Sequence, residues 1–245
     1  MFSAKLISRL KHAYHISVLT GAGISAESGV PTFRGKDGIW NNYNVAQLAT
    51  PEALKENAAL FWEFYHWRRS LLANIKPNFG HYSLVDLEKY FNEFTLITQN
   101  VDNLHRLAGS ENIIEIHGNI SKTKCSNCSF VREESIRNYE GKGIIRCPKC
   151  DHLMRPDVVL FNENLSSKVF EKAQESAATS EVFFSIGTSA LVEPAASLPY
   201  IAKGNGAYLV EINKEETPLT AHADESIRGE SGKILPHLVT VLFDS

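Results

Sequence analysis

The chain has 245 residues, of which 43% are hydrophobic and 22% charged, with 25 Lys and Arg against 28 Asp and Glu. This length suits one main domain with a smaller appended module, and the composition excludes a disordered or fibrous protein. The net charge of -3 lacks the basic excess of proteins that wrap nucleic acid, so we expect no nucleic-acid partner. No apolar run reaches the roughly 18 residues of a membrane helix, and we expect a soluble, cytoplasmic protein without a membrane partner.

Short apolar runs, rich in β-branched and aromatic residues, alternate with helical stretches along the chain. The runs predict strands at 16–20, 94–98, 113–117, 181–187, 207–212 and 238–243, and the stretches predict helices at 80–90, 166–178 and 194–203. Most of these strands are apolar throughout, as expected of parallel strands that are covered on both faces. The sequence therefore predicts an α/β fold with a doubly wound parallel sheet.

Two segments interrupt this alternation. Residues 51–74 are helical and rich in aromatic side chains, and residues 118–157 hold all four cysteines around Gly141-Lys142-Gly143. Because both segments lie between strands of the main sheet, we interpret them as insertions that form a smaller module.

A glycine-rich turn follows the first predicted strand directly. Gly21-Ala22-Gly23-Ile24-Ser25-Ala26 has the G-x-G-x-x-A form of the dinucleotide fingerprint, in which glycines allow the backbone to approach a pyrophosphate. A dehydrogenase would carry an acidic residue about 20 positions later at the end of a second strand, and residues 39–43 offer neither. We expect a dinucleotide here without hydride transfer, and residues 28–40 form either a lid over it or a solvated surface loop.

The cysteines are arranged as two pairs. Cys125 and Cys128 are separated by two residues, as are Cys147 and Cys150, with 18 residues between the pairs. This spacing is typical of a four-thiolate zinc site, whose metal has no open position and is therefore structural. Four unrelated thiols are disfavoured because no cysteine occurs elsewhere. Residues 118–157 carry eight Lys or Arg and five Asp or Glu. This mild basic excess keeps a nucleic-acid contact of this segment as the less favoured alternative to a solvated face.

Polar residues follow several predicted strands at the end where parallel sheets place ligand groups. They are Thr98-Gln99-Asn100-Val101-Asp102-Asn103, then His117, Gly187-Thr188-Ser189 and Asn213. Asp102 or Asn103 could instead cap the next helix, and a lone histidine is more often structural. His117 lies beside other such polar strand ends, which favours a general base.

One arginine is predicted on an apolar helix face. Phe61, Phe64, Tyr65, Leu71 and Leu72 form one stripe at helical spacing, and Arg68 falls in its middle, one turn from Tyr65. A buried arginine needs an anionic partner. An internal carboxylate and a substrate anion are equally good hypotheses.

Taken together, these motifs resemble those of the sirtuins, which are NAD-dependent protein-lysine deacylases. The matching stretches are residues 21–35, 98–102, His117-Gly118, the four cysteines, 155–159 and 187–189, and they occur in the family's order. The resemblance implies a Rossmann-like NAD-binding domain (1–35, 80–117 and 158–245) and a small domain built from a helical module (36–79) and a zinc-binding module (118–157). It also implies acylated-lysine proteins as substrates, and we expect a monomer.

The resemblance assigns roles to individual residues. His117 would be the general base, with Asn100 and Asp102 also catalytic. NAD, as a consumed co-substrate, would be held by Gly21, Ala22, Gly23, Ser25, Glu27, Phe33, Arg34, Trp40, Gln99, Asn100, Val101, Asp102, Gly187, Thr188, Ser189, Asn213, Lys214, Glu215 and Ser231. The acylated peptide would contact Ala49, Tyr65, Arg68, Val159 and Phe161. In the family the acyl oxygen attacks C1′ of the nicotinamide ribose, and the acyl group then migrates to a ribose hydroxyl that His117 would activate.

The segment Tyr65-His66-Trp67-Arg68 resembles the Tyr-x-x-Arg signature of sirtuins that remove succinyl and malonyl groups, which predicts those groups in preference to acetyl. The chain departs from the family at Asn103 and Asn162, where glycine is usual, and at Glu193, where an aromatic residue is frequent. Alternatives to this reading are an NAD-dependent ADP-ribosyltransferase, a plain deacetylase with a structural Arg68, and a zinc-ribbon binding module with a degenerate nucleotide site.

Overall fold

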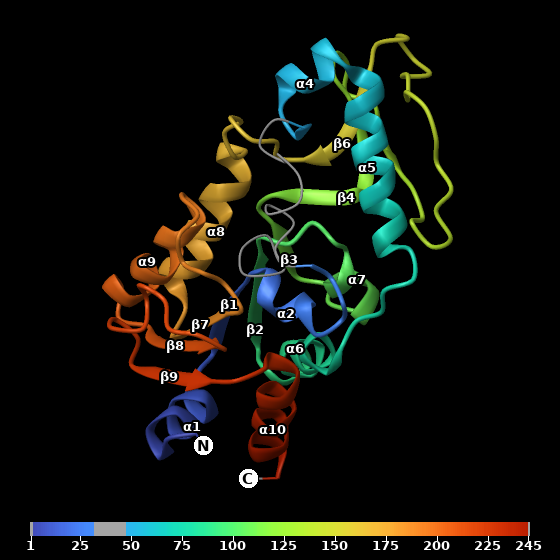
Figure 1. Ribbon diagram of the computed structural model, residues 1–245. Helices are drawn as coiled ribbons and strands as arrows, with labels where there is room; N and C mark the ends of the chain where they lie inside the picture. Colours follow the sequence, from blue (N-terminus) through green and yellow to red (C-terminus); the bar gives the residue numbers. More distant parts are fainter. Residues whose placement is uncertain (1, 32–47, 245) are drawn as a thin grey trace.

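The computed structural model describes residues 2–31 and 48–244, and its largest element is a six-stranded parallel sheet (Figure 1). The strands are β1 (His15–Thr20), β2 (Glu93–Thr98), β3 (Ile113–Glu115), β7 (Val182–Ile186), β8 (Tyr208–Asn213) and β9 (Glu225–Arg228). Their order is β3-β2-β1-β7-β8-β9, with every neighbouring pair parallel. This is the Rossmann order, in which the chain reverses direction across the sheet between β1 and β7. The predicted fold class is confirmed.

Helices cover both faces of this sheet, which explains why its strands are apolar throughout. In β7, Val182, Phe184 and Ile186 pack into one apolar cluster and Phe183 into another on the opposite face. The first cluster includes residues of α1 (Ala4–His12), α6 (Phe79–Tyr90) and α10 (Ser231–Phe243), and the second includes residues of α8 (Ser167–Thr179) and α9 (Leu198–Gly204). None of the helices in residues 2–31 and 48–244 combines the length and apolar character needed to cross a membrane.

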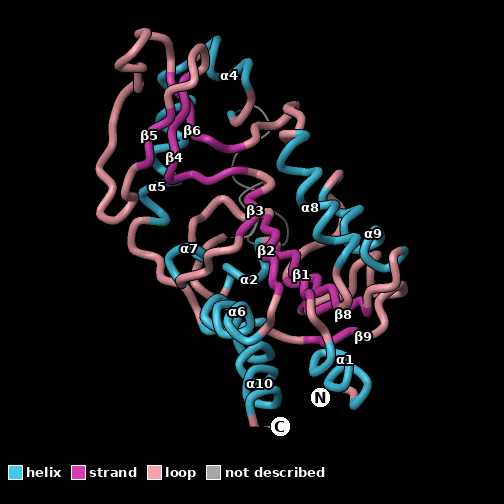
Figure 2. Tube along the Cα trace, turned by 180° about the vertical axis from the view of Figure 1, so that it is seen from behind, coloured by secondary structure: helices cyan, strands magenta, loops and turns pink. Residues whose placement is uncertain are grey.

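A second, antiparallel sheet lies apart from the first. It contains β4 (Gly118–Cys125), β5 (Val131–Glu133) and β6 (Met154–Val158), in the order β5-β4-β6. The helices α4 (Pro51–Glu56) and α5 (Ala58–Leu72) share an apolar cluster with this sheet. Figures 1 and 2 show these elements together at one end of the molecule, opposite the end that holds α1 and α10. The helices α4 and α5 and the small sheet, which are separated in the sequence, therefore share one apolar core.

The prediction of a strand at 238–243 is wrong, because these residues belong to α10. Leu238-Val-Thr-Val-Leu-Phe is apolar and β-branched, and such a short run fits a buried strand and a buried helix equally well. Ile234, Leu238 and Leu242 are buried at a spacing of four residues, so helical packing decided the outcome. The sequence reading also missed β9, which is short and largely polar, and α1, whose buried residues are Leu6 and Leu10.

Candidate active site

A cleft of about 1200 Å³ lies where the strands of the parallel sheet reverse their order, and it extends to α5 and to the segment after β6. The structure brings most of the predicted site residues to this one cleft. Its lining includes Gly21, Ala22, Gly23, Ala49, Tyr65, Arg68, Gln99, Asn100, Val101, His117, Val159, Phe161, Gly187, Thr188, Ser189, Asn213, Lys214, Glu215 and Ser231. Ser25, Glu27 and Asp102 are not among the lining residues, and Phe33, Arg34, Trp40 and most of the predicted lid lie outside the described residues.

Two glycine-containing turns meet at the floor of the cleft, one after β1 and one after β7. The amide N–H of Gly23 donates to the carbonyl oxygen of Gly187, at 2.8 Å. A Cβ on Gly23 would lie 2.7 Å from Gly187 Cα, and a Cβ on Gly187, which has φ +60°, would lie 2.6 Å from Ile24 N. Only glycine fits such a contact, so both turns present bare backbone to the cleft.

Side-chain amides and hydroxyls line the neighbouring strand ends. Gln99 Nε2 donates to Thr188 Oγ1 at 2.9 Å, and Asn213 Nδ2 donates to the Thr188 carbonyl at 3.1 Å. Asn100, which is buried, donates from Nδ2 to the Gly21 carbonyl at 3.0 Å and to Ser25 Oγ at 3.2 Å. These bonds tie β1, β2, β7 and β8 together at their carboxyl ends and fix the orientation of polar groups around the cleft.

His117 follows β3 and faces the same cleft. Its Nδ1 lies 2.9 Å from the Gln99 carbonyl oxygen. Because a carbonyl can only accept, Nδ1 carries the proton and Nε2 is the ring's acceptor. Burial lowers the pKa of His117, and the bond to Gln99 raises it in part. The imidazole is therefore neutral near pH 7 and able to accept a proton.

Asp102 lies behind the cleft lining and is almost fully buried. Burial raises its pKa, against the lowering effects of the Leu104 N–H, Ser25 and Arg68. Its Oδ1 accepts from Leu104 N at 2.9 Å at the start of α7 (Leu104–Ala108). The cap position of this helix is Asn103, whose side chain makes no cap bond, so Asp102 binds the first helical N–H from the position before the cap. Of its two neighbours Ser25 and Arg68, only Arg68 lines the cleft.

Glu27 follows α2 (Ala22–Ala26) and contacts the start of α10. Its Oε1 accepts from Gly232 N at 2.9 Å and from Ser231 Oγ at 3.1 Å. A carboxylate is favourable at free helix N–H groups, so Glu27 connects the glycine-rich turn to the Ser231 turn, and Ser231 itself lines the cleft.

The helix α5 brings Tyr65 and Arg68 to the cleft, opposite the nucleotide turns. Burial raises the pKa of Tyr65 to about 12, and it lowers the pKa of Arg68 while Tyr65 and Asp102 raise it. Asp102 thus gives Arg68 an acidic neighbour, as the hypothesis of an internal carboxylate partner required. The predicted stripe is wrong at Leu71, which is 38% exposed at the stripe's edge.

The segment after β6 forms the wall beside His117. Val159 N donates to the His117 carbonyl at 2.9 Å, and Phe161 N donates to the carbonyl of buried Ala49 at 2.9 Å. Sequence reasoning did not single out the ion pair between Arg155 and Glu163, which also binds the Val158 carbonyl and Leu160 N. The motif at 155–159 contains Arg155, but in the sequence analysis it served only to show that the motifs occur in the family's order.

Both positions at which asparagine replaces the family's usual glycine have a left-handed backbone. Asn103 has φ 68° and Asn162 has φ 66°. Asparagine is the residue that tolerates this conformation best after glycine, so the two substitutions preserve the backbone path. Asn103 Oδ1 also accepts from Asn119 Nδ2 at 2.8 Å, a bond that glycine could not make.

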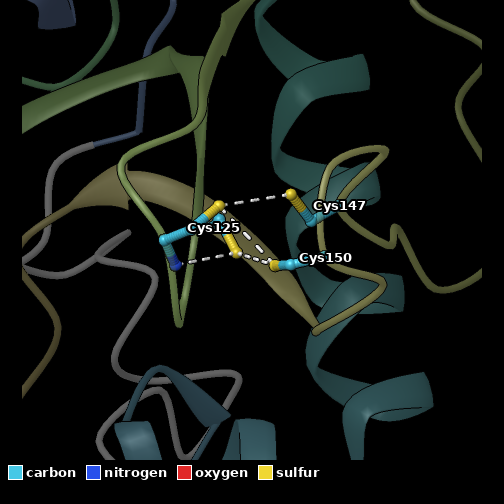
Figure 3. A group of neighbouring side chains, drawn as sticks. Cys125, Cys147 and Cys150 are labelled. Carbon is cyan, nitrogen blue, oxygen red and sulfur yellow. Dashed lines mark hydrogen bonds between the residues drawn. The ribbon is translucent and has the colours of Figure 1, made fainter.

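The four cysteines form one cluster between the β4–β5 turn and the segment before β6 (Figure 3). Their sulfur atoms all lie within 4.8 Å of one another, with Cys125 to Cys150 at 3.5 Å and Cys128 to Cys147 at 3.6 Å. A tetrahedral zinc ion with bonds of about 2.3 Å places its sulfurs about 3.8 Å apart. The N–H groups of Asn127 and Cys128 donate to Cys125 Sγ at 3.3 Å and 3.4 Å, an arrangement that stabilises a thiolate. The donor set therefore fits structural zinc.

Comparisons with known proteins agree with this geometry. The model of the Sir2 family matches residues 21–194. An NAD-dependent protein deacylase of Pyrococcus abyssi is 48% identical over 96% of this chain and 95% of its own. A solved Sir2 homologue in complex with NAD is 41% identical, with a TM-score of 0.93 over 100% of this chain and 95% of its own. A Sir2 structure with a p53 peptide and NAD+ is 29% identical, with a TM-score of 0.86 over the whole of both chains. The chain belongs to the Sir2 family.

Proposed function

We propose that this protein removes acyl groups from lysine side chains of other proteins and consumes NAD in the reaction. The observation that carries the proposal is one cleft lined by the glycine-containing turns, by the side-chain amides of Gln99 and Asn100 and by a neutral, oriented His117. Relatives across nearly the full length of the chain are NAD-dependent protein deacylases. The chain is a sirtuin enzyme of this kind, with NAD as co-substrate.

The reaction converts NAD, an acylated lysine and water into nicotinamide, O-acyl-ADP-ribose and free lysine. In our proposal the Gly23 and Gly187 turns hold the dinucleotide through backbone groups, and Gln99, Asn100 and Asn213 orient its ribose and nicotinamide. Nε2 of His117 accepts the proton of a ribose hydroxyl, so that this oxygen can take over the acyl group. Asp102 acts from behind this layer, through Ser25 and Arg68.

We also propose a division into two domains with different tasks. Residues 1–35, 80–117 and 158–245 bind NAD, whereas residues 36–79 and 118–157 form the small domain. Zinc bound to Cys125, Cys128, Cys147 and Cys150 would have four sulfur ligands and no open position, so it would cross-link the small domain and take no part in the reaction.

The acyl pocket is proposed to favour acidic acyl groups. Tyr65 and Arg68 both line the cleft, and together they offer a hydroxyl and a guanidinium to the terminal carboxylate of a succinyl or malonyl group. Such a charge-assisted bond contributes about 1.5–3 kcal/mol, equivalent to a preference of roughly tenfold to over a hundredfold. Asp102 beside Arg68 favours the competing function, a plain deacetylase in which Arg68 balances the buried carboxylate.

The test of deacylation is release of nicotinamide with and without an acylated lysine peptide, in the parent protein and in His117→Ala. We expect release that depends on the peptide, and a loss of roughly a hundredfold or more in product formation in the variant, the usual scale for a general base. Nicotinamide exchange, which precedes the action of the base, should suffer less. Release without lysine deacylation would instead indicate an ADP-ribosyltransferase.

The test of acyl preference is kcat/KM on one peptide that carries succinyl-lysine or acetyl-lysine, for the parent, Tyr65→Phe and Arg68→Met. Arg68→Met should abolish the succinyl preference and preserve acetyl turnover. The control is Arg9→Met, on the exposed surface of α1. If the parent favours acetyl-lysine, or if Arg68→Met harms both substrates equally, Arg68 is a partner of Asp102 and not a receptor for the acyl group.

A further inference from the structure

The helix α5 carries two neighbouring rows of side chains that face different parts of the molecule. Tyr65 and Arg68 line the cleft. The second row contains Trp62, His66 and Arg69, and His66 and Arg69 each follow a residue of the first row directly. This row is buried against the small sheet and against the segment between the two cysteine pairs. Because both rows belong to one rigid helix, whatever fixes the second row also fixes the direction of the first.

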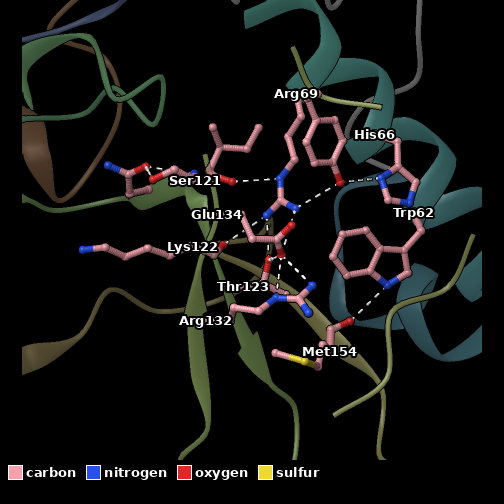
Figure 4. A network of polar contacts seen from close by, with 12 residues as sticks. Trp62, His66, Arg69, Ser121, Lys122, Thr123, Arg132, Glu134 and Met154 are labelled. Atoms are coloured by element: carbon pink, nitrogen blue, oxygen red, sulfur yellow. Dashed lines mark hydrogen bonds and ion pairs between the residues drawn. The ribbon is translucent and has the colours of Figure 1, made fainter. Parts of the chain in front are cut away.

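Arg69 is fully buried and bonds mainly to β4 (Figure 4). Its Nε donates to the Ile120 carbonyl at 2.9 Å, and its Nη2 donates to Thr123 Oγ1 at 2.7 Å. Glu134 Oε1 lies 3.8 Å from Nη1 and is the nearby carboxylate. Nearly every direction of the guanidinium fork therefore has a partner, and the side chain cannot turn without leaving buried donors unsatisfied.

A chain of directed hydrogen bonds continues from Arg69 to the loop before Cys147. Arg69 Nη1 donates to Tyr139 OH at 3.3 Å, and Tyr139 OH lies 2.7 Å from His66 Nδ1. His66 Nε2 lies 2.7 Å from the Gly143 carbonyl, so Nε2 carries the proton and Nδ1 accepts from the tyrosine. The rings of His66 and Tyr139 also stack, with centroids 5.7 Å apart. Each donor in this chain has one acceptor, which sets a unique arrangement.

We infer that Arg69, Tyr139 and His66 form a positioning device for the acyl pocket, here called the Arg69 network. By holding α5 to β4 and to the loop between the cysteine pairs, the Arg69 network sets the angle at which Tyr65 and Arg68 enter the cleft. None of its three members lines the cleft in the described residues, so they act through the helix. The inference rests on the proposed function in one respect: it takes Tyr65 and Arg68 as the contacts of the acyl group.

The experiment uses Tyr139→Phe, which removes one hydroxyl and keeps the stacked ring, and Arg69→Lys, which keeps the charge and loses the fork. The control is Tyr14→Phe, whose side chain is 59% exposed. For each full-length protein we would measure kcat and KM on succinyl-lysine and acetyl-lysine peptides, KM for NAD, bound zinc and Tm. Peptide Kd from calorimetry gives the corresponding ratio for binding alone, without turnover.

In Tyr139→Phe and Arg69→Lys, the ratio of kcat/KM between the two peptides should change about threefold to tenfold, mainly through the peptide KM. KM for NAD and bound zinc should stay at the parent's values. In an Arg68→Met background, Tyr139→Phe should no longer change the ratio, because the residue through which the network acts is absent.

An unchanged ratio in both variants, with only Tm lowered, would overturn the proposal and leave the Arg69 network as ordinary packing. An equal change of the ratio with and without Arg68 would also overturn it. A parent that prefers acetyl-lysine contradicts the proposed acyl preference and with it the premise that Arg68 contacts the acyl group. A parent that prefers succinyl-lysine, with an unchanged ratio in Tyr139→Phe and Arg69→Lys, contradicts the network proposal alone.

Discussion

The parallel sheet and the small antiparallel sheet are held together by different interactions. In the parallel sheet all five residues of β7 are buried, and two extended apolar clusters cover the two faces. In the small sheet all three residues of β5 are exposed. The apolar cluster that this sheet shares with α4 and α5 is joined there by a cysteine cluster and by the buried Arg69. One region distributes its stabilisation over apolar contacts on two faces of a sheet, whereas the other combines one apolar cluster with stabilisation concentrated at a few polar points.

This difference bears on the cleft, which takes residues from both regions. The groups proposed for NAD and for the base lie at the strand ends of the parallel sheet, where hydrogen bonds cross from strand to strand. The groups proposed for the acyl chain lie on α5, whose setting depends on the small sheet. Substitutions in the small region should therefore change substrate choice more readily than they change the handling of NAD.

The largest expected effect tests the concentrated stabilisation. Cys147→Ala removes one of four sulfur ligands, and a structural zinc site contributes about 10 kcal/mol or more to folding. We expect loss of zinc, solubility and activity together, measured by metal analysis, sedimentation and nicotinamide release. Ser129→Ala, an exposed neighbour in the β4–β5 turn, is the control. Full activity in a zinc-free Cys147→Ala protein would show that the metal does not hold the small region together.

The matching test of the distributed stabilisation is Phe183→Ala, in the centre of the parallel sheet. Phe183 is fully buried, and replacing a buried phenylalanine by alanine lowers the free energy of unfolding by about 3–5 kcal/mol. Equilibrium urea unfolding should show this loss with normal zinc content, whereas Phe79→Ala, at a residue 74% exposed, should stay near the parent. Zinc loss in Phe183→Ala would mean that the two regions are not independent.

The next effect concerns the pH dependence of the region near α6. Burial lowers the pKa of His81 to about 4, against about 6.5 in the unfolded chain. Between these values the unfolded state binds a proton that the folded state does not, so stability decreases as pH falls from 6.5 to 4. His81 therefore contributes about 3 kcal/mol to the loss of folding stability on acidification. Burial also lowers the pKa of His105, which adds to this loss in the same direction.

Urea unfolding of the parent and His81→Asn, at pH 7 and pH 4.5 and with equal bound zinc, isolates this contribution. The variant should lose less stability on acidification than the parent. Equal losses in the two proteins would mean that other groups, such as the zinc thiolates, account for the acid sensitivity.

The smallest expected effect concerns the left-handed backbone at Asn162. Asn162→Gly should change the free energy of unfolding by less than about 1 kcal/mol, because relief of backbone strain is offset by the greater freedom of the unfolded chain. Asn162→Ala should lose about 1–2 kcal/mol, the cost of placing alanine in this conformation. Thermal unfolding of the three proteins tests the order, and an alanine variant as stable as the parent would contradict it.

Sequence reasoning identified the parallel sheet, the glycine-rich turn and the cysteine pairs because each is a local pattern with a physical meaning. Strands that are apolar throughout must be covered by other elements on both faces. Two closely spaced cysteine pairs are typical of a zinc site. The same reasoning was wrong at 238–243, where a run of six residues, five of them apolar, did not contain enough information to distinguish a strand from a helix. Its assignment of Glu27 to NAD stays a prediction, and in the described residues this carboxylate binds the start of α10.

By itself, the sequence determined the motifs and their order along the chain, since a turn, a metal knuckle or a strand end depends on a few adjacent residues. The sequence also singled out Arg68 for the cleft, and only the tertiary structure decided that the adjacent Arg69 is buried in a polar network. Helical periodicity places Arg68 and Arg69 about 100° apart on α5, but it does not say what lies opposite each. That depended on β4 and Tyr139, which are more than 45 residues away in the sequence and supply the carbonyl and hydroxyl acceptors that a buried guanidinium requires.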